Sequence, residues 1–281
     1  MKFVKPEIFL TFKSKPDNDE IYRWLIFIGC SIEIARKYAY PVNDCMTAAE
    51  RGVELFGRRC YMSFELGLNP NITRIRDNIV DYIDNILKAK HGSVLEHITF
   101  TFCIENVSRV FTAEMNRHRA GVAISEGSMR YIRYNDIPIV DVPSFTSLSN
   151  QLTVEEEIIN SRRNATRGYI RYCVANIESV YNSLVKIWQD TLTGPEFLGK
   201  KHITSMLRRI IPMGVATGGV WTFNIRSLRH MLTMRTSPAA EEEILLVAGM
   251  ILGRMQQEEP AFFGDFTKDK NNNWKPKYEK V

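Results

Sequence analysis

Apolar residues recur at intervals of three and four over residues 71–90, where Ile75, Ile79, Ile83, Ile86 and Leu87 would share one face of a helix. This periodicity predicts an amphipathic helix that packs one stripe against the core. Apolar spacing also predicts shorter helices over residues 44–56, 108–116, 203–211, 224–234 and 241–257. Pro212 would close the helix at 203–211, because a proline disfavours helical backbone at the residue before it.

The longest predicted helix runs from residue 153 to about residue 190, either unbroken or interrupted near Gly168. Thr153 and Glu156 mark its start, since they have the spacing of a capping box ahead of Ile158 and Ile159. The segment GPEFLGKK that follows is predicted to be a connection.

The period changes to two in EHITFTFCIE, residues 96–105, where Ile98, Phe100, Phe102 and Ile104 alternate with more polar side chains. This alternation predicts a strand with one buried face. Pro138, Pro143 and SFTSLSN at residues 144–150 predict a loop. The first 50 residues are predicted to be an irregular or mixed lead-in, and the polar residues 268–281 a frayed tail.

The totals indicate an ordinary globular chain of 281 residues, with 44% hydrophobic and 25% charged residues. Its five cysteines are scattered and never form a CxxC pair, which argues against a disulfide framework or a metal site. The first 20 residues are too charged for a signal peptide, and the most apolar run, residues 24–29, is too short to span a bilayer. We therefore expect a cytoplasmic protein without a membrane partner.

The net charge of +5 favours an anionic small ligand over nucleic acid, whose dedicated binders are usually more basic. The chain shows neither regular βαβ alternation nor a GxGxxG motif, so a Rossmann fold is not expected. No composition shift marks a domain boundary.

Arg117, His118 and Arg119 are consecutive, and a glycine-punctuated stretch follows them. On a regular helix or strand the three side chains would diverge, so they can converge on one anion only where the backbone turns. The triplet is either a loop that grips an extended anion such as a phosphate or pyrophosphate, or a solvated basic patch. Two further clusters of histidine with polar residues, HGSVLEH and SLRHML, favour the first interpretation.

The last cluster belongs to NIRSLRHMLTMR, residues 224–235. On a helix its apolar residues would form one arc, with Arg226, His230 and Thr233 roughly opposite. Arg235 would lie at the edge of the apolar arc and needs a partner, because an unpaired buried charge is costly. That partner is either a carboxylate of this chain or a ligand.

Four ordered elements of the chain resemble those of the flavin-dependent thymidylate synthase family (ThyX). The triplet RHR is followed after eight residues by Ser128, with Glu126 before it and Arg130 and Tyr131 after it. HGSVLEHITFTF, LRRIIP and NIRSLRHMLTMR resemble three further elements of that family. The resemblance covers roughly residues 55–265.

The resemblance implies an α/β fold, a single domain with a mainly antiparallel sheet flanked by helices. We expect residues 1–50 to be a lead-in packed on the core, 51–267 the synthase domain and 268–281 a tail. The implied reaction is reductive methylation of dUMP to dTMP. FAD would be the redox cofactor, NADPH its reductant and methylenetetrahydrofolate the carbon donor. The resemblance also implies a homotetramer whose active sites are shared between subunits.

Residue roles follow from the matched motif positions. The cofactor-binding candidates are Ser93, Glu96, Arg117, His118, Arg119, Glu126, Asn224, Arg226 and His230. The substrate-binding candidates are His91 on the folate side, then Glu114, Arg117, Glu126, Gly127, Ser128, Met129, Arg130, Arg208 and Arg235. Arg235 and Ser128 are the catalytic candidates, with the Arg235 guanidinium stabilising negative charge that develops on the pyrimidine.

The chain departs from the family pattern around the triplet. Ile124 and Ser125 precede Glu126, the spacer is one residue longer than in the commonest pattern, and Glu114 stands where glutamine is often found. Two alternatives therefore stay open: an enzyme of this type acting on another pyrimidine nucleotide, or a non-catalytic relative that binds an anion or nucleic acid.

Overall fold

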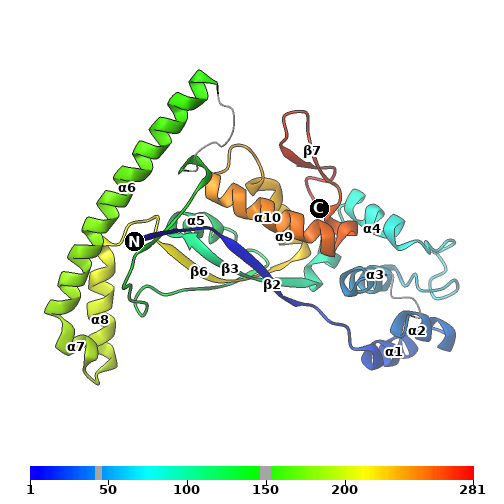
Figure 1. Cartoon of the computed structure of the whole chain (residues 1–281). Helices are drawn as coiled ribbons and strands as arrows, with labels where there is room; N and C mark the ends of the chain where they lie inside the picture. The colour runs from blue at the N-terminus through cyan, green and yellow to red at the C-terminus, as the bar shows by residue number, and fades with distance from the viewer. Residues whose placement is uncertain (42–45, 146–152) are drawn as a thin grey trace.

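A four-stranded antiparallel sheet forms the centre of the molecule, for which the computed structural model describes residues 1–41, 46–145 and 153–281 (Figure 1). Its order is β2 (Glu7–Lys13), β3 (Thr99–Ser108), β6 (Ala216–Asn224) and β4 (Val122–Glu126). Two small pairs join β1 (Lys2–Val4) to β5 (Pro138–Val140) and β7 (Phe266–Lys268) to β8 (Trp274–Pro276). The expected α/β class with a mainly antiparallel sheet is confirmed.

The helices follow in chain order. They are α1 (Asn18–Phe27), α2 (Ile32–Ala39), α3 (Ala48–Tyr61), α4 (Ile79–Lys88), α5 (Arg109–Met115), α6 (Val154–Ile187), α7 (Gln189–Thr193), α8 (Phe197–Leu207), α9 (Ile225–Arg235), α10 (Glu242–Glu258) and α11 (Pro260–Phe263). Short 3-10 turns are η1 (Gly92–His97), η2 (Pro143–Phe145) and η3 (Arg208–Ile210). The long helix α6 lies at one side of the sheet and α1–α3 at the other (Figure 1).

The main core lies between the sheet and the helices α4, α9 and α10. Phe100, Phe102 and Ile104 alternate along β3 and are almost fully buried, which confirms the predicted strand and its buried face. Helix α9 contributes the predicted arc, since Ile225, Leu228, Met231 and Leu232 are fully buried in the same cluster. Burial of this apolar surface is the main favourable term that holds α9 on the sheet.

The helix boundaries differ from the predictions where a cap or a long-range contact intervenes. Helix α4 begins at Ile79 and leaves Ile75 outside, because the Asn78 side chain accepts from the backbone of Val80 and Asp81. Helix α6 is unbroken through Gly168, and Thr153 with Glu156 forms the predicted capping box. Helix α8 already begins in the segment expected to be a connection. The predicted loop at 138–150 contains β5, and its residues 146–150 lie outside the described part, as do residues 44 and 45 of the helix predicted at 44–56.

The first fifty residues are more regular than predicted. Strand β2 pairs along most of its length with β3 and forms one edge of the central sheet, opposite β4. Helices α1 and α2 pack around Leu25, Tyr38 and Phe64 in a second apolar cluster. The boundaries predicted for the three segments of the chain stay a prediction.

The prediction of a frayed C-terminal tail is wrong. Strand β8 pairs with β7, and Trp274, Tyr278 and Val281 pack against the main core. The local sequence is polar, but these three side chains gain apolar contacts with residues far away in the chain. None of the helices in the described ranges has the length and apolar character needed to cross a membrane.

Glu259 is a buried carboxyl that makes the fold sensitive to pH. Its side chain is 3% exposed and accepts from the Thr47 hydroxyl at 2.6 Å, close to the buried Glu50. Burial, with the nearby charge of Glu50, raises the pKa of Glu259 to about 7. A carboxyl with a raised folded-state pKa stabilises the fold fully only below its unfolded-state pKa, and this stability is lost as pH rises through about 7.

We therefore expect Glu259→Gln to raise the melting temperature by a few degrees at pH 8 and to change it little at pH 5. The contrast is Glu258→Gln, because a hydrogen bond from Lys13 lowers the pKa of that half-buried carboxyl. Thermal unfolding followed by circular dichroism at both pH values measures the effect. An equal change at pH 5 and pH 8 would contradict the account.

Candidate active site

Helix α9 begins directly at the end of β6, and Asn224 makes this junction. The Asn224 side chain accepts from the backbone N–H of Ser227 at 2.8 Å, and the Ser227 hydroxyl donates to the carbonyl of Gly121 at 2.9 Å. Gly121 has a φ of 68°, and a side chain there would collide with the Asn224 amide. The loop after the basic triplet is thereby held against the first turn of α9.

The last turn of α9 carries Arg235, which is bound by two groups of α5 and the triplet. Its Nε donates to His118 Nε2 at 2.9 Å, and its Nη1 donates to Glu114 Oε2 at 2.7 Å. Nη2 lies 3.3 Å from the Glu114 backbone oxygen, and the Arg235 side chain is 13% exposed. The sequence left two possible partners of Arg235 open, a carboxylate of this chain or a ligand. In the structure the carboxylate of Glu114 binds it.

His118 is held in its neutral form. Burial is the main cause that lowers its pKa to about 4, and the positive charge of Arg235 adds to it. Because His118 Nε2 accepts from Arg235, the ring proton of the neutral imidazole belongs on Nδ1. The ring of His230 meets that of His118 edge to face, with centroids 6.3 Å apart.

A cavity of about 450 Å³ opens beside the first turns of α9. Glu96, Asn224, Arg226 and His230, all predicted to bind the cofactor, line it. Arg226 Nη1 donates to Glu96 Oε1 at 2.6 Å, which joins η1 to α9. The rest of the wall comes from the loop after the triplet and from the C-terminal residues, Tyr278 to Val281.

The end of β4 forms a second polar cluster. Glu126 pairs with Arg109 and accepts from Asn116 Nδ2 at 2.9 Å, while Asn116 Oδ1 accepts from Trp221 Nε1 at 3.1 Å. Burial, with the charge of Arg208 next in size, lowers the pKa of Arg109. The predicted residue Arg208 therefore lies near this cluster.

The backbone turns after Glu126, where Gly127 N–H donates to the Gly218 carbonyl at 2.8 Å and Ser128 accepts from Tyr131 N–H at 3.0 Å. Arg130 is exposed beside this turn. Met129 differs from its neighbours, because its side chain packs in an apolar cluster with Ile137 and leaves only its backbone to a ligand.

Several predicted residues have few protein contacts. Arg117 is exposed and lies 3.5 Å from Glu114, and Ser93 and Arg119 are also exposed. His91 stacks on Tyr61, with ring centroids 6.0 Å apart. The structure therefore gathers most of the predicted residues around α9 and α5 and places His91 at the margin.

The sequence interpretation missed Arg109, Asn116 and Arg229. Arg109 and Asn116 are seven residues apart around α5, so two helical turns bring them to the same side. That spacing was a usable signal beside the triplet. Arg229 is buried on the α9 face toward the C-terminal residues, and its partner Asp265 is too distant in the sequence to be inferred.

The cavity beside α9 suits a phosphate-bearing ligand. Arg226, His230, Lys280 and the Asn224 amide supply N–H donors, and the volume falls within the usual range of ligand pockets, about 300–1,000 Å³. At Gly92 a Cβ atom would lie 2.6 Å from Arg226 Nε. Any other residue at this position would therefore displace the Arg226 side chain. These features fit the nucleotide part of a flavin dinucleotide.

We expect Arg235→Ala to raise the pKa of His118 above about 4 while leaving it below the ordinary 6.5, because burial is the larger cause. Histidine ring NMR signals followed from pH 3.5 to 8 measure this. Arg226→Ala is the control on the same helix, since Arg226 is bound to Glu96 and does not contact His118. An unchanged His118 titration in Arg235→Ala would contradict the contact.

A family model described as Thymidylate synthase complementing protein (Thy1) matches residues 42–261. The flavin-dependent thymidylate synthase of Corynebacterium efficiens is 32% identical over 220 residues, which cover 78% of this chain and 80% of that protein.

Two more relatives are similar over more than four fifths of their length. The flavin-dependent thymidylate synthase of Mycobacteroides abscessus is 30% identical over 81% of this chain and 85% of its own. The probable flavin-dependent thymidylate synthase of Mycobacterium phage D29 is 30% identical over 79% of this chain and 86% of its own. This chain belongs to the Thy1 family of thymidylate synthase complementing proteins.

Proposed function

We propose that the protein is a flavin-dependent thymidylate synthase, which methylates dUMP reductively to dTMP. The observation that carries the proposal is the site around α9, where the family's ordered polar residues come together from three distant segments of the chain. Arg226, His230 and Arg235 lie on α9, Glu96 on η1, and His118 directly after α5.

FAD is the proposed cofactor, with Arg226, His230, Asn224, Glu96 and the triplet as the residues that would hold it. When bound, the flavin supplies the hydride chemistry, and the protein binds, orients and polarises. The basic donors along the cavity support a pyrophosphate there. NADPH as reductant and methylenetetrahydrofolate as carbon donor complete the proposed reaction, with His91 on the folate side.

Arg235 is the residue we propose nearest to the chemistry. Glu114 and His118 orient its guanidinium through two hydrogen bonds, at 2.7 and 2.9 Å. A guanidinium fixed in this way stabilises negative charge developing on the pyrimidine without reorganising in the transition state. Neutral His118 accepts from Arg235 and so adds no second positive charge to repel it.

The turn after β4 is the proposed cradle for the nucleotide. Its backbone is fixed on both sides, because Arg109 and Asn116 hold Glu126 and the Gly218 carbonyl binds Gly127. Ser128, Arg130 and Arg208 then offer a hydroxyl and two guanidiniums to the phosphate and sugar of dUMP.

We also propose a homotetramer with shared active sites. The long helix α6 supports a partner subunit, since Tyr169, Tyr172 and Ile187 are large apolar side chains that it leaves exposed.

One alternative rests on Glu114. A carboxylate at this position, bound to Arg235, would favour a pyrimidine that offers a donor where uracil offers an acceptor. The same enzyme would then act on a different pyrimidine nucleotide. Turnover of dUMP and dCMP compared side by side distinguishes the two.

The proposed function is tested by absorption spectroscopy of the purified protein, with FAD added if it is colourless. Under anaerobic conditions NADPH should bleach the flavin, and dUMP with methylenetetrahydrofolate should restore its absorption as dTMP forms. A protein that takes up no flavin would overturn the proposal and favour the alternative hypothesis of an anion-binding or nucleic-acid-binding site.

Arg235→Ala should retain FAD and lose about 100-fold or more in dTMP formation, a loss typical of removing one electrostatic donor at the reacting centre. Arg254→Ala, an exposed arginine on α10, is the matched control and should keep full turnover. Bound flavin is measured by absorption and dTMP by chromatography. Unchanged turnover in Arg235→Ala would remove this residue from the mechanism.

A further inference from the structure

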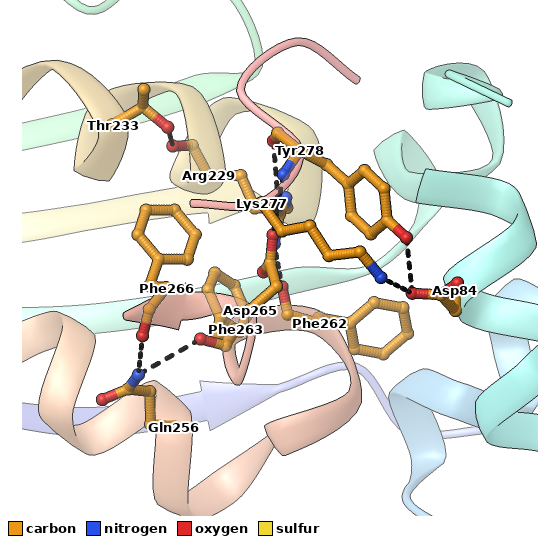
Figure 2. A network of polar contacts seen from close by, with 10 residues as sticks. All are labelled: Asp84, Arg229, Thr233, Gln256, Phe262, Phe263, Asp265, Phe266, Lys277 and Tyr278. Atoms are coloured by element: carbon orange, nitrogen blue, oxygen red, sulfur yellow. Dashed lines mark hydrogen bonds and ion pairs between the residues drawn. The ribbon is translucent and has the colours of Figure 1, made fainter. Parts of the chain in front are cut away.

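The C-terminal strap, residues 274–281, lies outside the part of the chain that the family model matches. It contains β8, and its residues Lys277 and Tyr278 lie between Asp84 of α4 and Arg229 of α9 (Figure 2). Its last residues line the cavity beside α9. None of the family motif residues described above belongs to this strap. Its anchors and its last residues indicate what it does.

The first anchor is Arg229, whose side chain is 3% exposed on α9. Its two terminal nitrogens donate to the two oxygens of Asp265, at 2.6 and 2.9 Å. They also donate to the carbonyls of Phe262 and, at 3.0 Å, Tyr278 (Figure 2). Asp265 in turn accepts from the backbone N–H of Tyr278 at 3.2 Å. The buried charge is thereby paired, and the pair holds the strap by its backbone.

The second anchor is Asp84 on α4. It accepts from the Tyr278 hydroxyl at 2.7 Å and from Lys277 Nζ at 3.2 Å (Figure 2). The hydrogen bond from Tyr278 lowers the pKa of Asp84, so this carboxylate stays ionised near neutral pH. The strap is therefore fixed on two helices before it reaches the cavity.

At the cavity the strap binds Arg226. A backbone oxygen of Val281 accepts from Arg226 Nε at 2.9 Å, while Glu96 accepts from Nη1 at 2.6 Å. Within the described ranges Nη2 has no protein acceptor, and Arg226 lines the cavity. Two acceptors thus fix the plane of the guanidinium and leave its remaining donors to a ligand.

The charges on the strap suit an anion at the same place. Lys280 lines the cavity together with Arg226 and His230. Glu279 also lines it, but its carboxylate lies 3.6 Å from Lys275 and so has a cation beside it. The other acidic side chain that lines the cavity, Glu96, is paired with Arg226.

We infer that the C-terminal strap is a fixed wall of the flavin site, which orients Arg226 and adds Lys280 to bind the phosphate-bearing part of the dinucleotide. This inference rests on the proposed function. The strap is a preorganised part of the site, because both anchors are hydrogen bonds between protein groups and spare the cofactor the cost of ordering it.

The opposite role is that of a competitor, in which the backbone oxygen of Val281 occupies Arg226 and must leave before FAD binds. The two roles predict opposite changes. If the strap is part of the FAD site, loosening it weakens FAD binding. If the strap competes with FAD, loosening it strengthens FAD binding.

The test is stopped-flow flavin fluorescence on the full chain, which gives the association and dissociation rates of FAD. Gly92→Ala places a methyl group between Arg226 and Val281, and Lys280→Gln removes the cation. Gly253→Ala is the matched control, since a Cβ there meets no atom within 4 Å. We expect about 10-fold weaker FAD binding in each of the first two variants, mainly through faster dissociation, and no change in the control.

Asp84→Ala separates a wall from a merely structural tail, because Asp84 touches the strap and not the cavity. Hydrogen exchange of the amides in residues 274–281 should accelerate in this variant, and FAD dissociation should accelerate with it. In the wild-type protein, FAD should slow exchange of the same amides.

The outcomes are distinct. Faster exchange of the strap with unchanged FAD dissociation would overturn the wall and leave the proposed function intact. Tighter FAD binding in Gly92→Ala or Asp84→Ala would overturn it in favour of a competitor. A wild-type protein that binds no FAD would overturn the proposed function itself, and the strap inference with it.

Discussion

The position of α9 is the constraint on which the site depends. Strand β6 passes into α9 without a linker, and Asn224 belongs to both as the last residue of the strand and the cap of the helix. Antiparallel pairing with β3 fixes β6 in register, and the four fully buried side chains of α9 fix its rotation. Arg226, His230 and Arg235 have no freedom left except in their own side chains. A substitution at Asn224 would therefore disturb the whole set.

The sequence predicted the helices and strands whose type follows from the spacing of their own apolar residues. Strand β3 and helix α9 were predicted with their buried faces because alternate residues, or residues three and four apart, must pack on one side. The start of α4 was missed because the Asn78 cap outweighs the apolar Ile75. The ordered tail was missed because Tyr278 gains its partners from Asp84 and Arg229, and no local pattern contains them.

The sequence predicted which residues gather at the candidate site, but it did not predict which of them contact one another. The motif positions around the triplet and α9 do come together, but the partner of Arg235 could not be chosen from the sequence. Glu114 lies 121 residues away, and only the sheet brings α5 beside the end of α9.

Helix α5 connects the surroundings of Arg235 to those of Glu126. Seven residues long, it presents Glu114 to Arg235 from one side and Arg109 and Asn116 to Glu126 from another. Two turns of helix are too short to bend between these contacts, so a ligand that displaces one end moves the other. Thermodynamic linkage then requires reciprocity. If a ligand at the end of β4 changes the affinity for a second ligand near Arg235, the second ligand changes the affinity for the first by the same factor.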